Sequence, residues 1–174
     1  GSGTGIRIDA NQGYTPNELI RFYNKIRPLH IELIEQPLPA KAIHEMKQLP
    51  ASIKKQVAAD ESLLDHTDAF RLTEHPAACG IFNIKLMKCG GIANALKIAT
   101  VAESAHINLM WGCNDESIIS ISAALHAALS CPHTRYLDLD GSLDLAKDVV
   151  SEGFILENGL MRCNGLPGLG LKAA

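Results

Sequence analysis

Three carboxylates and one lysine recur at a nearly constant spacing that could bring them together for metal binding and proton transfer. Asp9, Glu35, Asp60 and Lys85 each end a short apolar run, and successive members lie 26, 25 and 25 positions apart. If these runs are neighbouring parallel strands, about 4.8 Å apart, the four side chains converge at one edge of a sheet. A single acidic residue at a strand end is more often a helix cap, so the prediction rests on the repetition.

The three carboxylates need a partner of opposite charge, because carboxylates at one point repel one another and raise each other's pKa values. A hard divalent cation relieves this repulsion, and all-oxygen ligation with room for water and substrate suits Mg²⁺. Burial and a neighbouring Mg²⁺ would lower the pKa of Lys85 toward the range of a general base. The spacing therefore predicts a magnesium site made by Asp9, Glu35 and Asp60, with Lys85 beside it.

Other charged residues near these positions do not fit the repeat. Glu32 lies on the opposite face of its strand, Glu61 comes one position after Asp60, and Lys88 falls in the next turn, where we expect a solvated side chain. The seven histidines show no HxxxH or HExxH spacing, which argues against a zinc site. No GxSxG segment is present either, which argues against a hydrolase nucleophile of that type.

A DxD pair, Asp138 and Asp140, lies on one face of the last predicted strand. As a structural feature, the pair could cap the turn before Gly141. As a functional feature, it could hold a second cation or receive an ammonium group. The pattern alone leaves these interpretations open.

The elements that position these residues alternate regularly along the chain. The predicted strands cover residues 6–9, 31–35, 56–60, 81–86, 107–111 and 136–139. The predicted helices cover about 41–48, 67–75, 91–106 and 116–130, and an earlier helix begins with Thr15 as N-cap and ends at Pro28. Strands that alternate with helices over short connections indicate βαβ units and a parallel sheet.

The polar residue at the end of each strand favours a (β/α)-barrel, in which catalytic groups come from those ends. A doubly wound open sheet is the structural alternative, but no GxGxxG follows the first strand. Six units are visible where a closed barrel needs eight, so we expect a partial barrel over residues 1–150. Residues 151–174, with Asn158-Gly159 as a hairpin signal, are expected to form a short β-ribbon on the barrel or on a domain outside this chain.

Composition places the chain among ordinary globular proteins. It has 174 residues, of which 47% are hydrophobic, and its formal net charge of −3 gives no reason to expect nucleic acid or an anionic membrane as partner. No apolar run approaches the roughly 18–20 residues of a membrane span, and no signal peptide is visible. Five cysteines without a CxxC pair fit free thiols in a reducing cytoplasm, which is the expected location.

Four segments of the chain resemble the enolase superfamily, in its muconate-lactonizing subgroup. IRIDANQGY, IELIEQPLP, VAADES and NIKLMKCGG are similar, in order and spacing, to the third to sixth barrel strands of that family. By this resemblance Asp9, Glu35 and Asp60 are Mg²⁺ ligands and Lys85 is the acid/base lysine of the sixth strand. GCNDES resembles the seventh strand, with Glu116 at the position of the family's glutamate. Together with Glu116, further polar residues are expected around the ligands: Asn11, Glu61 and Asn83.

LDLDGSLDL resembles the eighth-strand segment of the dipeptide epimerases, such as L-Ala-D/L-Glu epimerases, where the DxD pair holds the substrate's α-ammonium group. The resemblance implies an isomerase in which Mg²⁺ binds the substrate carboxylate and stabilises the enediolate formed when a base removes the α-proton. Two lysines on opposite faces of the α-carbon would then exchange the roles of acid and base, and the substrate would be a dipeptide.

The resemblance also shows what these 174 residues lack. The family's opposite-face lysine belongs to a KxK motif on the second strand, and the capping domain precedes that strand, whereas this chain begins at the third. GSGTG at residues 1–5 resembles the loop before the third strand, so a truncated natural sequence is expected rather than an engineered start. We expect the chain to be unable to epimerise a substrate alone, and the open strand edges to favour association, with a homo-oligomer as one outcome.

Two alternatives remain beside a dipeptide epimerase. Muconate cycloisomerase or o-succinylbenzoate synthase belongs to the same superfamily, but those substrates carry no ammonium group for the DxD pair. From another class, the chain could be a non-catalytic fragment or partner-binding module that completes a split barrel.

Overall fold

In the part of the chain that the structure describes, six parallel strands form one sheet whose spatial order follows the sequence. The computed structural model describes residues 4–173. The strands are β1 (Ile6–Asp9), β2 (Ile31–Glu35), β3 (Val57–Ala59), β4 (Ile81–Ile84), β5 (Asn108–Trp111) and β6 (Thr134–Leu137). Every neighbouring pair is parallel, which confirms the predicted repeat. The described chain is therefore a partial (β/α)-barrel, as the sequence predicts.

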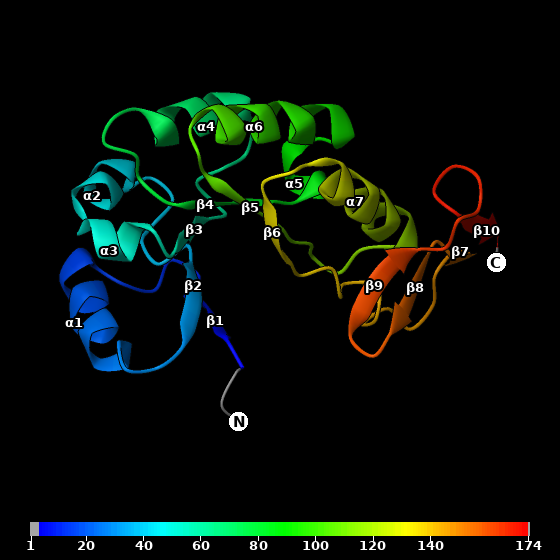
Figure 1. Ribbon diagram of the computed structural model, residues 1–174, viewed down its shortest axis with the longest axis horizontal. Helices are drawn as coiled ribbons and strands as arrows, with labels where there is room; N and C mark the ends of the chain where they lie inside the picture. The colour runs from blue at the N-terminus through cyan, green and yellow to red at the C-terminus, as the bar shows by residue number, and fades with distance from the viewer. Residues whose placement is uncertain (1–3, 174) are drawn as a thin grey trace.

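Within the described residues, seven helices cover one face of this sheet, and a small apolar cluster lies on the other face. They are α1 (Pro16–Ile26), α2 (Ile43–Gln48), α3 (Ala51–Lys54), α4 (His66–Thr73), α5 (Leu86–Cys89), α6 (Ile92–Ser104) and α7 (Ile118–Ser130). Figure 1 shows them as an arc that runs from α1 over α4 and α6 to α7. The main core lies between these helices and the sheet, while Leu33, Ala58, Ile81 and Met110 pack together as a separate cluster with Tyr136.

The start of α1 follows its sequence signals. Thr15 is the N-cap, its hydroxyl accepts a hydrogen bond from Glu18 N, and the Glu18 carboxylate accepts one from Thr15 N at 2.9 Å. Pro16 occupies the first helical position, where its missing N–H costs nothing. The predicted N-cap at Thr15 is therefore confirmed, and Thr15 and Glu18 complete a capping box.

Several boundaries differ from the predicted ones, and two of them matter for the site. The helix predicted over 41–48 begins at Ile43, and a second short helix, α3, follows Pro50. The strand predicted over 81–86 ends at Ile84, and the single turn α5 begins at Leu86. Backbone hydrogen bonds close this turn, and from it the Lys88 side chain reaches the main-chain oxygens of Asp60 and Asn83.

The last strand is displaced from its predicted position. β6 covers Thr134–Leu137 rather than residues 136–139, and its register with β5 shifts between Leu109 and Met110. The prediction that Asp138 and Asp140 lie on one face of a strand was therefore wrong. Both residues belong to the loop after β6, which remains attached to the sheet through a hydrogen bond from Asp138 N to Trp111 O.

The tail forms two small antiparallel sheets, which confirms the expected β-structure but divides it. β8 (Phe154–Glu157) pairs with β9 (Leu160–Cys163) across the Asn158-Gly159 turn, where both residues have the positive φ that such hairpins require. β7 (Val150–Glu152) pairs with β10 (Leu171–Ala173). The Ser122 hydroxyl of α7 donates to Gly153 O and Leu169 O, so the tail is fastened to the last barrel helix. The division at residue 150 stays a prediction.

Other expectations concern features outside the sheet. All five cysteines are among the described residues and are free thiols. Within residues 4–173, no helix combines the length and apolar character needed to cross a membrane. The interpretation of GSGTG as a family loop falls mainly on residues 1–3, which lie outside the described residues.

Candidate metal and acid–base site

The four residues of the repeat stand at the carboxyl ends of β1 to β4. Asp9 and Glu35 are the last residues of β1 and β2, whereas Asp60 and Lys85 directly follow β3 and β4. Glu35 and Asp60 are 6% and 7% exposed, but Asp9 is exposed because β1 is the edge of the sheet. The fold therefore brings the four predicted residues to one edge and buries the two central carboxylates.

Two lysines neutralise Asp60. Lys85 Nζ donates to Asp60 Oδ2 at 2.7 Å and lies 3.7 Å from Glu35 Oε1. Lys88 Nζ contacts Asp60 Oδ1 and also donates to two main-chain oxygens, Asp60 O at 2.7 Å and Asn83 O at 3.1 Å. The Lys88 side chain is 13% exposed, so its expectation as a solvated turn residue was wrong. The reason is α5, whose single turn carries position 88 back over Asp60.

The burial of Glu35 makes its carboxyl group hard to ionise. Burial first, and then the charges of Asp60 and Asp9, raise the pKa of Glu35 to about 7, against the opposing effects of Asn83 and Lys85. Like charges raise a carboxyl pKa only when they are close and poorly screened. The three carboxylates therefore interact electrostatically, as the sequence predicts.

The charges on the other groups follow from the same contacts. Burial alone would raise the pKa of Asp60, but the charge of Lys88 and hydrogen bonds from both lysines hold it below its usual value. Burial alone would lower the pKa of Lys85, but the hydrogen bond and charge of Asp60, with Glu35 and Asp9, raise it. Carboxylate charge therefore surrounds the Lys85 ammonium group, and the lowering of its pKa by a neighbouring Mg²⁺ stays a prediction. Burial lowers the pKa of Lys88 despite Asp60.

Asn83 orients the Glu35 carboxylate through a buried hydrogen bond. Its side chain is fully buried, Nδ2 donates to Glu35 Oε1 at 2.6 Å, and Oδ1 has no hydrogen-bond partner within the described part of the chain. A Cβ atom on Gly112 would lie 2.6 Å from Asn83 Oδ1, so any larger residue at position 112 would clash with the Asn83 amide. Asn83 lies where the sequence predicts a polar residue around the ligands.

Asn11 and Glu61 also lie beside the carboxylate cluster. Asn11 binds both oxygens of Asp9, from its main-chain N at 2.9 Å and its Nδ2 at 2.8 Å. Glu61 Oε1 accepts a hydrogen bond from Gln12 Nε2 at 3.0 Å rather than contacting a carboxylate ligand. Asn11 can therefore orient Asp9, whereas Glu61 fixes the neighbouring loop.

Gln36 is a site residue that sequence reasoning missed. It is fully buried with a φ of 30°, and its Oε1 accepts hydrogen bonds from Asp60 N at 2.9 Å and Ser62 N at 3.2 Å. Its Nε2 donates to Leu38 O at 2.8 Å, so the side chain ties the ends of β2 and β3 together. A glutamine one position after Glu35 was an available signal in the sequence.

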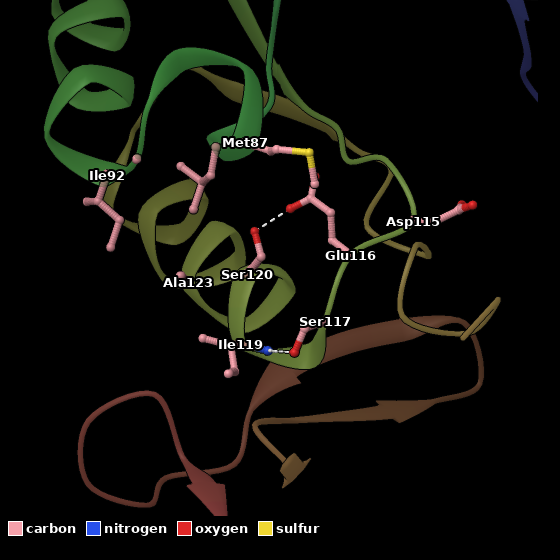
Figure 2. A pocket seen from close by; sticks show the side chains of 10 residues that line it. Met87, Ile92, Asp115, Glu116, Ser117, Ile119, Ser120 and Ala123 are labelled. Carbon is pink, nitrogen blue, oxygen red and sulfur yellow. Dashed lines mark hydrogen bonds between the residues drawn. The ribbon is translucent and has the colours of Figure 1, made fainter. Parts of the chain in front are cut away.

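Glu116 lies apart from the carboxylate cluster. Its carboxylate accepts hydrogen bonds from Asn114 N at 2.9 Å and from the Ser120 hydroxyl. Figure 2 shows this side chain pointing toward Ser120. Both residues line a largely apolar pocket of about 610 Å³ between α5, α6 and the start of α7. The contacts of Glu116 are therefore local, and no bond joins it to the described carboxylates of the repeat.

The DxD pair is near the cluster but is much less confined. Asp138 and Asp140 are both exposed, and Cys113 Sγ lies 3.3 Å from Asp138 O and 3.7 Å from Asp140 Oδ1. Partial burial of its carboxyl group and the charge of Asp140 raise the pKa of Asp138, whereas Arg7 and Lys85 oppose this rise. The loop after β6 therefore lies within electrostatic reach of the carboxylate cluster.

The oxygen atoms of the carboxylate cluster suit a hard divalent cation, although their side chains are not arranged around one point. Among the described residues, no three His, Cys, Asp or Glu side chains are close enough together to share a metal ion. Two lysines nevertheless take the position of a counter-cation on Asp60, and the buried Asn83 Oδ1 provides an unpaired oxygen beside Glu35. Oxygen ligands around excess negative charge are the chemistry that Mg²⁺ selects.

Comparison with known proteins places this geometry in context. The family model described as "Enolase C-terminal domain-like" matches residues 1–174. The L-Lys-D/L-Arg epimerase of Methylococcus capsulatus is 61% identical over 166 residues, which are 95% of this chain and 47% of that protein. The L-Ala-D/L-Glu epimerase of Clostridium acetobutylicum is 41% identical over 96% of this chain and 47% of its own length. The chain spans about half the length of these relatives.

Two solved structures similar to this chain are also dipeptide epimerases. The dipeptide epimerase of Methylococcus capsulatus complexed with Mg and the dipeptide L-Arg-D-Lys superimposes with a TM-score of 0.94 at 60% identity, over 97% of this chain and 48% of that one. The dipeptide epimerase of Enterococcus faecalis V583 complexed with Mg and L-Leu-L-Tyr gives a TM-score of 0.89 at 36% identity, over 98% and 49% of the two chains.

Proposed function

Because this chain belongs to the enolase C-terminal domain-like family, we propose that it carries the metal- and lysine-bearing part of a Mg²⁺-dependent dipeptide epimerase. The observation that carries the proposal is the cluster of Asp60, Glu35 and Lys85 at adjacent strand ends, with Lys85 Nζ between the two carboxylates. Relatives at 61% and 41% identity are dipeptide epimerases, which favours epimerisation over the cycloisomerase and synthase alternatives.

In this proposal Asp9, Glu35 and Asp60 hold Mg²⁺, and Asn11 and Asn83 orient the first two through their hydrogen bonds. The bound ion would supply a Lewis acid that stabilises the negative charge developing on the substrate carboxylate. Buried carboxylates exclude competing water, so the ion's charge acts in a poorly screened environment.

Lys85 is the proposed acid/base residue, with the proton carried at Nζ. Its ammonium group is held by carboxylates, which raise its pKa. A cation shared by the same carboxylates would weaken that hold and move the pKa toward the range where a lysine can accept a proton. In this proposal Lys85 serves one face of the α-carbon, and a second acid/base group serves the opposite face.

Asp138 and Asp140 are the proposed receptor for the α-ammonium group. Both are exposed at the same end of the sheet, and two neighbouring carboxylates attract a compact cation strongly. The identity to L-Lys-D/L-Arg epimerases is higher than the identity to L-Ala-D/L-Glu epimerases, which supports a substrate with cationic side chains. We therefore propose dipeptides of lysine and arginine as the substrate class.

A chimera tests this function directly. The N-terminal part of the Methylococcus capsulatus epimerase, joined to this chain in place of its own C-terminal part, restores the segment that relatives have and this chain does not span. We expect Mg²⁺-dependent exchange of the α-proton of L-Arg-L-Lys for deuterium, followed by NMR, and slower exchange with L-Ala-L-Glu.

Two controls make the outcome decisive. Lys85→Met in the chimera should abolish exchange from one epimer while leaving the fold intact by circular dichroism. A folded chimera that binds Mg²⁺ but exchanges no α-proton from either dipeptide would contradict the epimerase proposal and favour a non-catalytic module.

A further inference from the structure

The two lysines on Asp60 are anchored differently. Lys85 Nζ approaches Asp60 Oδ2, and its described contacts are with carboxylates alone, those of Asp60 and Glu35. Lys88 Nζ approaches the other oxygen, Oδ1, and also donates to the main-chain oxygens of Asp60 and Asn83. The side chains are 14% and 13% exposed, so their exposed fractions do not distinguish the two lysines. Their hydrogen-bond partners do.

This difference decides how each lysine responds when a cation competes for the carboxylates. Lys85 has no described acceptor besides the carboxylate oxygens that the cation would take, so it is free to move aside. If Lys88 moved aside, Asn83 O would lose the hydrogen bond from Lys88 Nζ, and Asp60 O would keep only the one from Leu63 N. Hydrogen bonds lost by buried acceptors are costly. Lys88 is therefore expected to stay in place.

We propose that Lys88 is a positioning residue of the metal site, holding Asp60 Oδ1 from the main-chain side and leaving Oδ2 directed toward Glu35 and Lys85. The inference rests on the proposed magnesium site and extends it to a residue that the repeat of strand ends does not include. Hydrogen-bond partners that orient a metal ligand are worth about 10–100-fold in metal affinity.

The rival interpretation is that Lys88 is only a counter-cation. An ammonium group near a metal site repels the incoming ion, so removal of a pure counter-cation would tighten Mg²⁺ binding. Removal of a positioning residue would weaken it, because Asp60 would lose the contact that fixes its rotamer. The two interpretations predict opposite signs for the same measurement.

The test is calorimetric titration of this chain with Mg²⁺, comparing the wild type with Lys88→Met, Lys88→Gln and Lys85→Met. We expect Lys88→Met to bind Mg²⁺ about 10–100-fold more weakly. Lys88→Gln should lose less affinity, because an amide N–H can still donate to the carbonyls. Lys85→Met is the matched control at the same carboxylate, and it should bind Mg²⁺ as tightly as the wild type or more tightly.

The outcomes separate this inference from the proposed function. Unchanged or tighter binding by Lys88→Met overturns the positioning role and leaves the magnesium site standing. A folded wild-type chain that binds no Mg²⁺ overturns both. If circular dichroism shows that Lys88→Met does not fold, the Mg²⁺ affinity of Lys88→Gln decides instead. Weaker Mg²⁺ binding than the wild type supports positioning, and equal or tighter binding overturns it.

A second readout separates positioning from catalysis. In the chimera, saturating Mg²⁺ should restore most of the kcat of the Lys88→Met variant, because only the occupancy of the site is impaired. The same Mg²⁺ concentration should not restore Lys85→Met. Failure of high Mg²⁺ to restore the Lys88→Met variant would assign Lys88 to the reaction itself and overturn the proposal.

Discussion

The carboxylates at the ends of β2 and β3 and those in the loop after β6 lie at the carboxyl ends of the strands of one sheet, but their surroundings differ. Glu35 and Asp60 are buried and bound by Asn83, Lys85 and Lys88. Asp138 and Asp140 are exposed, and the described contact to either carboxylate is a weak one from a thiol at 3.7 Å. The first pair is held in place by this chain, and the second is not.

The difference follows from position in the sheet. β2 and β3 have strands on both sides and helices behind them, so their ends are covered by neighbouring residues. β6 is the last strand of the sheet, and its loop faces the small antiparallel sheets of the tail (Figure 1). We infer that metal binding depends on the buried residues at the ends of β2 and β3. Recognition of the ammonium group depends on the segment that packs over the exposed loop after β6.

The largest effect is expected from Asp60→Asn. The substitution removes the carboxylate shared by two buried ammonium groups, and breaking such a buried pair costs about 3–5 kcal/mol of unfolding free energy. Mg²⁺ binding should disappear with it. Urea denaturation and calorimetry measure both quantities, and Glu152→Gln, which breaks the exposed pair with Lys172, is a control expected to change stability by less than about 1 kcal/mol. Retention of Mg²⁺ binding would show that Asp60 is not a ligand.

A pH dependence of stability should come next in size. The pKa of Glu35 is raised to about 7, mainly by burial, so the folded chain binds more protons than the unfolded chain between pH 4.5 and 7. Stability should therefore fall as pH rises through this window, by about 3 kcal/mol for a shift of this size. Denaturation without Mg²⁺ at pH 5 and pH 8 measures the effect.

Glu35→Gln is the control for that pH dependence, because an amide does not titrate. The variant should show little change in stability between the two pH values. If the stability of Glu35→Gln changed with pH as much as that of the wild type, the pH dependence would belong to another group. The electrostatic coupling of Glu35 and Asp60 would then lose one of its supports.

A smaller effect is expected from Gly112→Ala. The added Cβ would meet Asn83 Oδ1 at 2.6 Å and displace the amide from Glu35, and overpacking of this kind costs about 1–3 kcal/mol. Mg²⁺ affinity should fall as well. The double variant Gly112→Ala/Asn83→Ala relieves the clash, so its cost should be less than the sum of the single costs. Additive costs would show that Gly112 acts independently of Asn83.

The smallest effects are expected at Asp138 and Asp140, the exposed carboxylates in the loop after β6. Asp138→Asn and Asp140→Asn should each change the unfolding free energy by less than about 0.5 kcal/mol, because exposed residues without strong partners contribute little. Mg²⁺ affinity should also stay within about twofold, since neither residue is a proposed ligand. A loss of stability like that of Asp60→Asn would show that the β6 loop is as tightly built as the buried cluster.

The repeat of strand ends was visible in the sequence because each strand contributes its last polar residue after a short apolar run. Asp9, Glu35, Asp60 and Lys85 could therefore be found without a structure. Lys88 could not, because its position depends on α5, and a single helical turn leaves little pattern in the sequence. The boundaries of β6 were also missed, because the register shift against β5 follows from tertiary packing rather than from local alternation.

By itself, the sequence determined the alternation of strands and helices, the start of α1, the tail hairpin and the residues that meet at the sheet edge. These features depend on local propensity and on periodicity, both of which the chain carries in its own order. Tertiary structure alone decided which carboxylates are buried, which lysines neutralise them and that the DxD pair stands exposed after β6. Burial and charge pairing arise between residues far apart in sequence, so only the folded chain determines them.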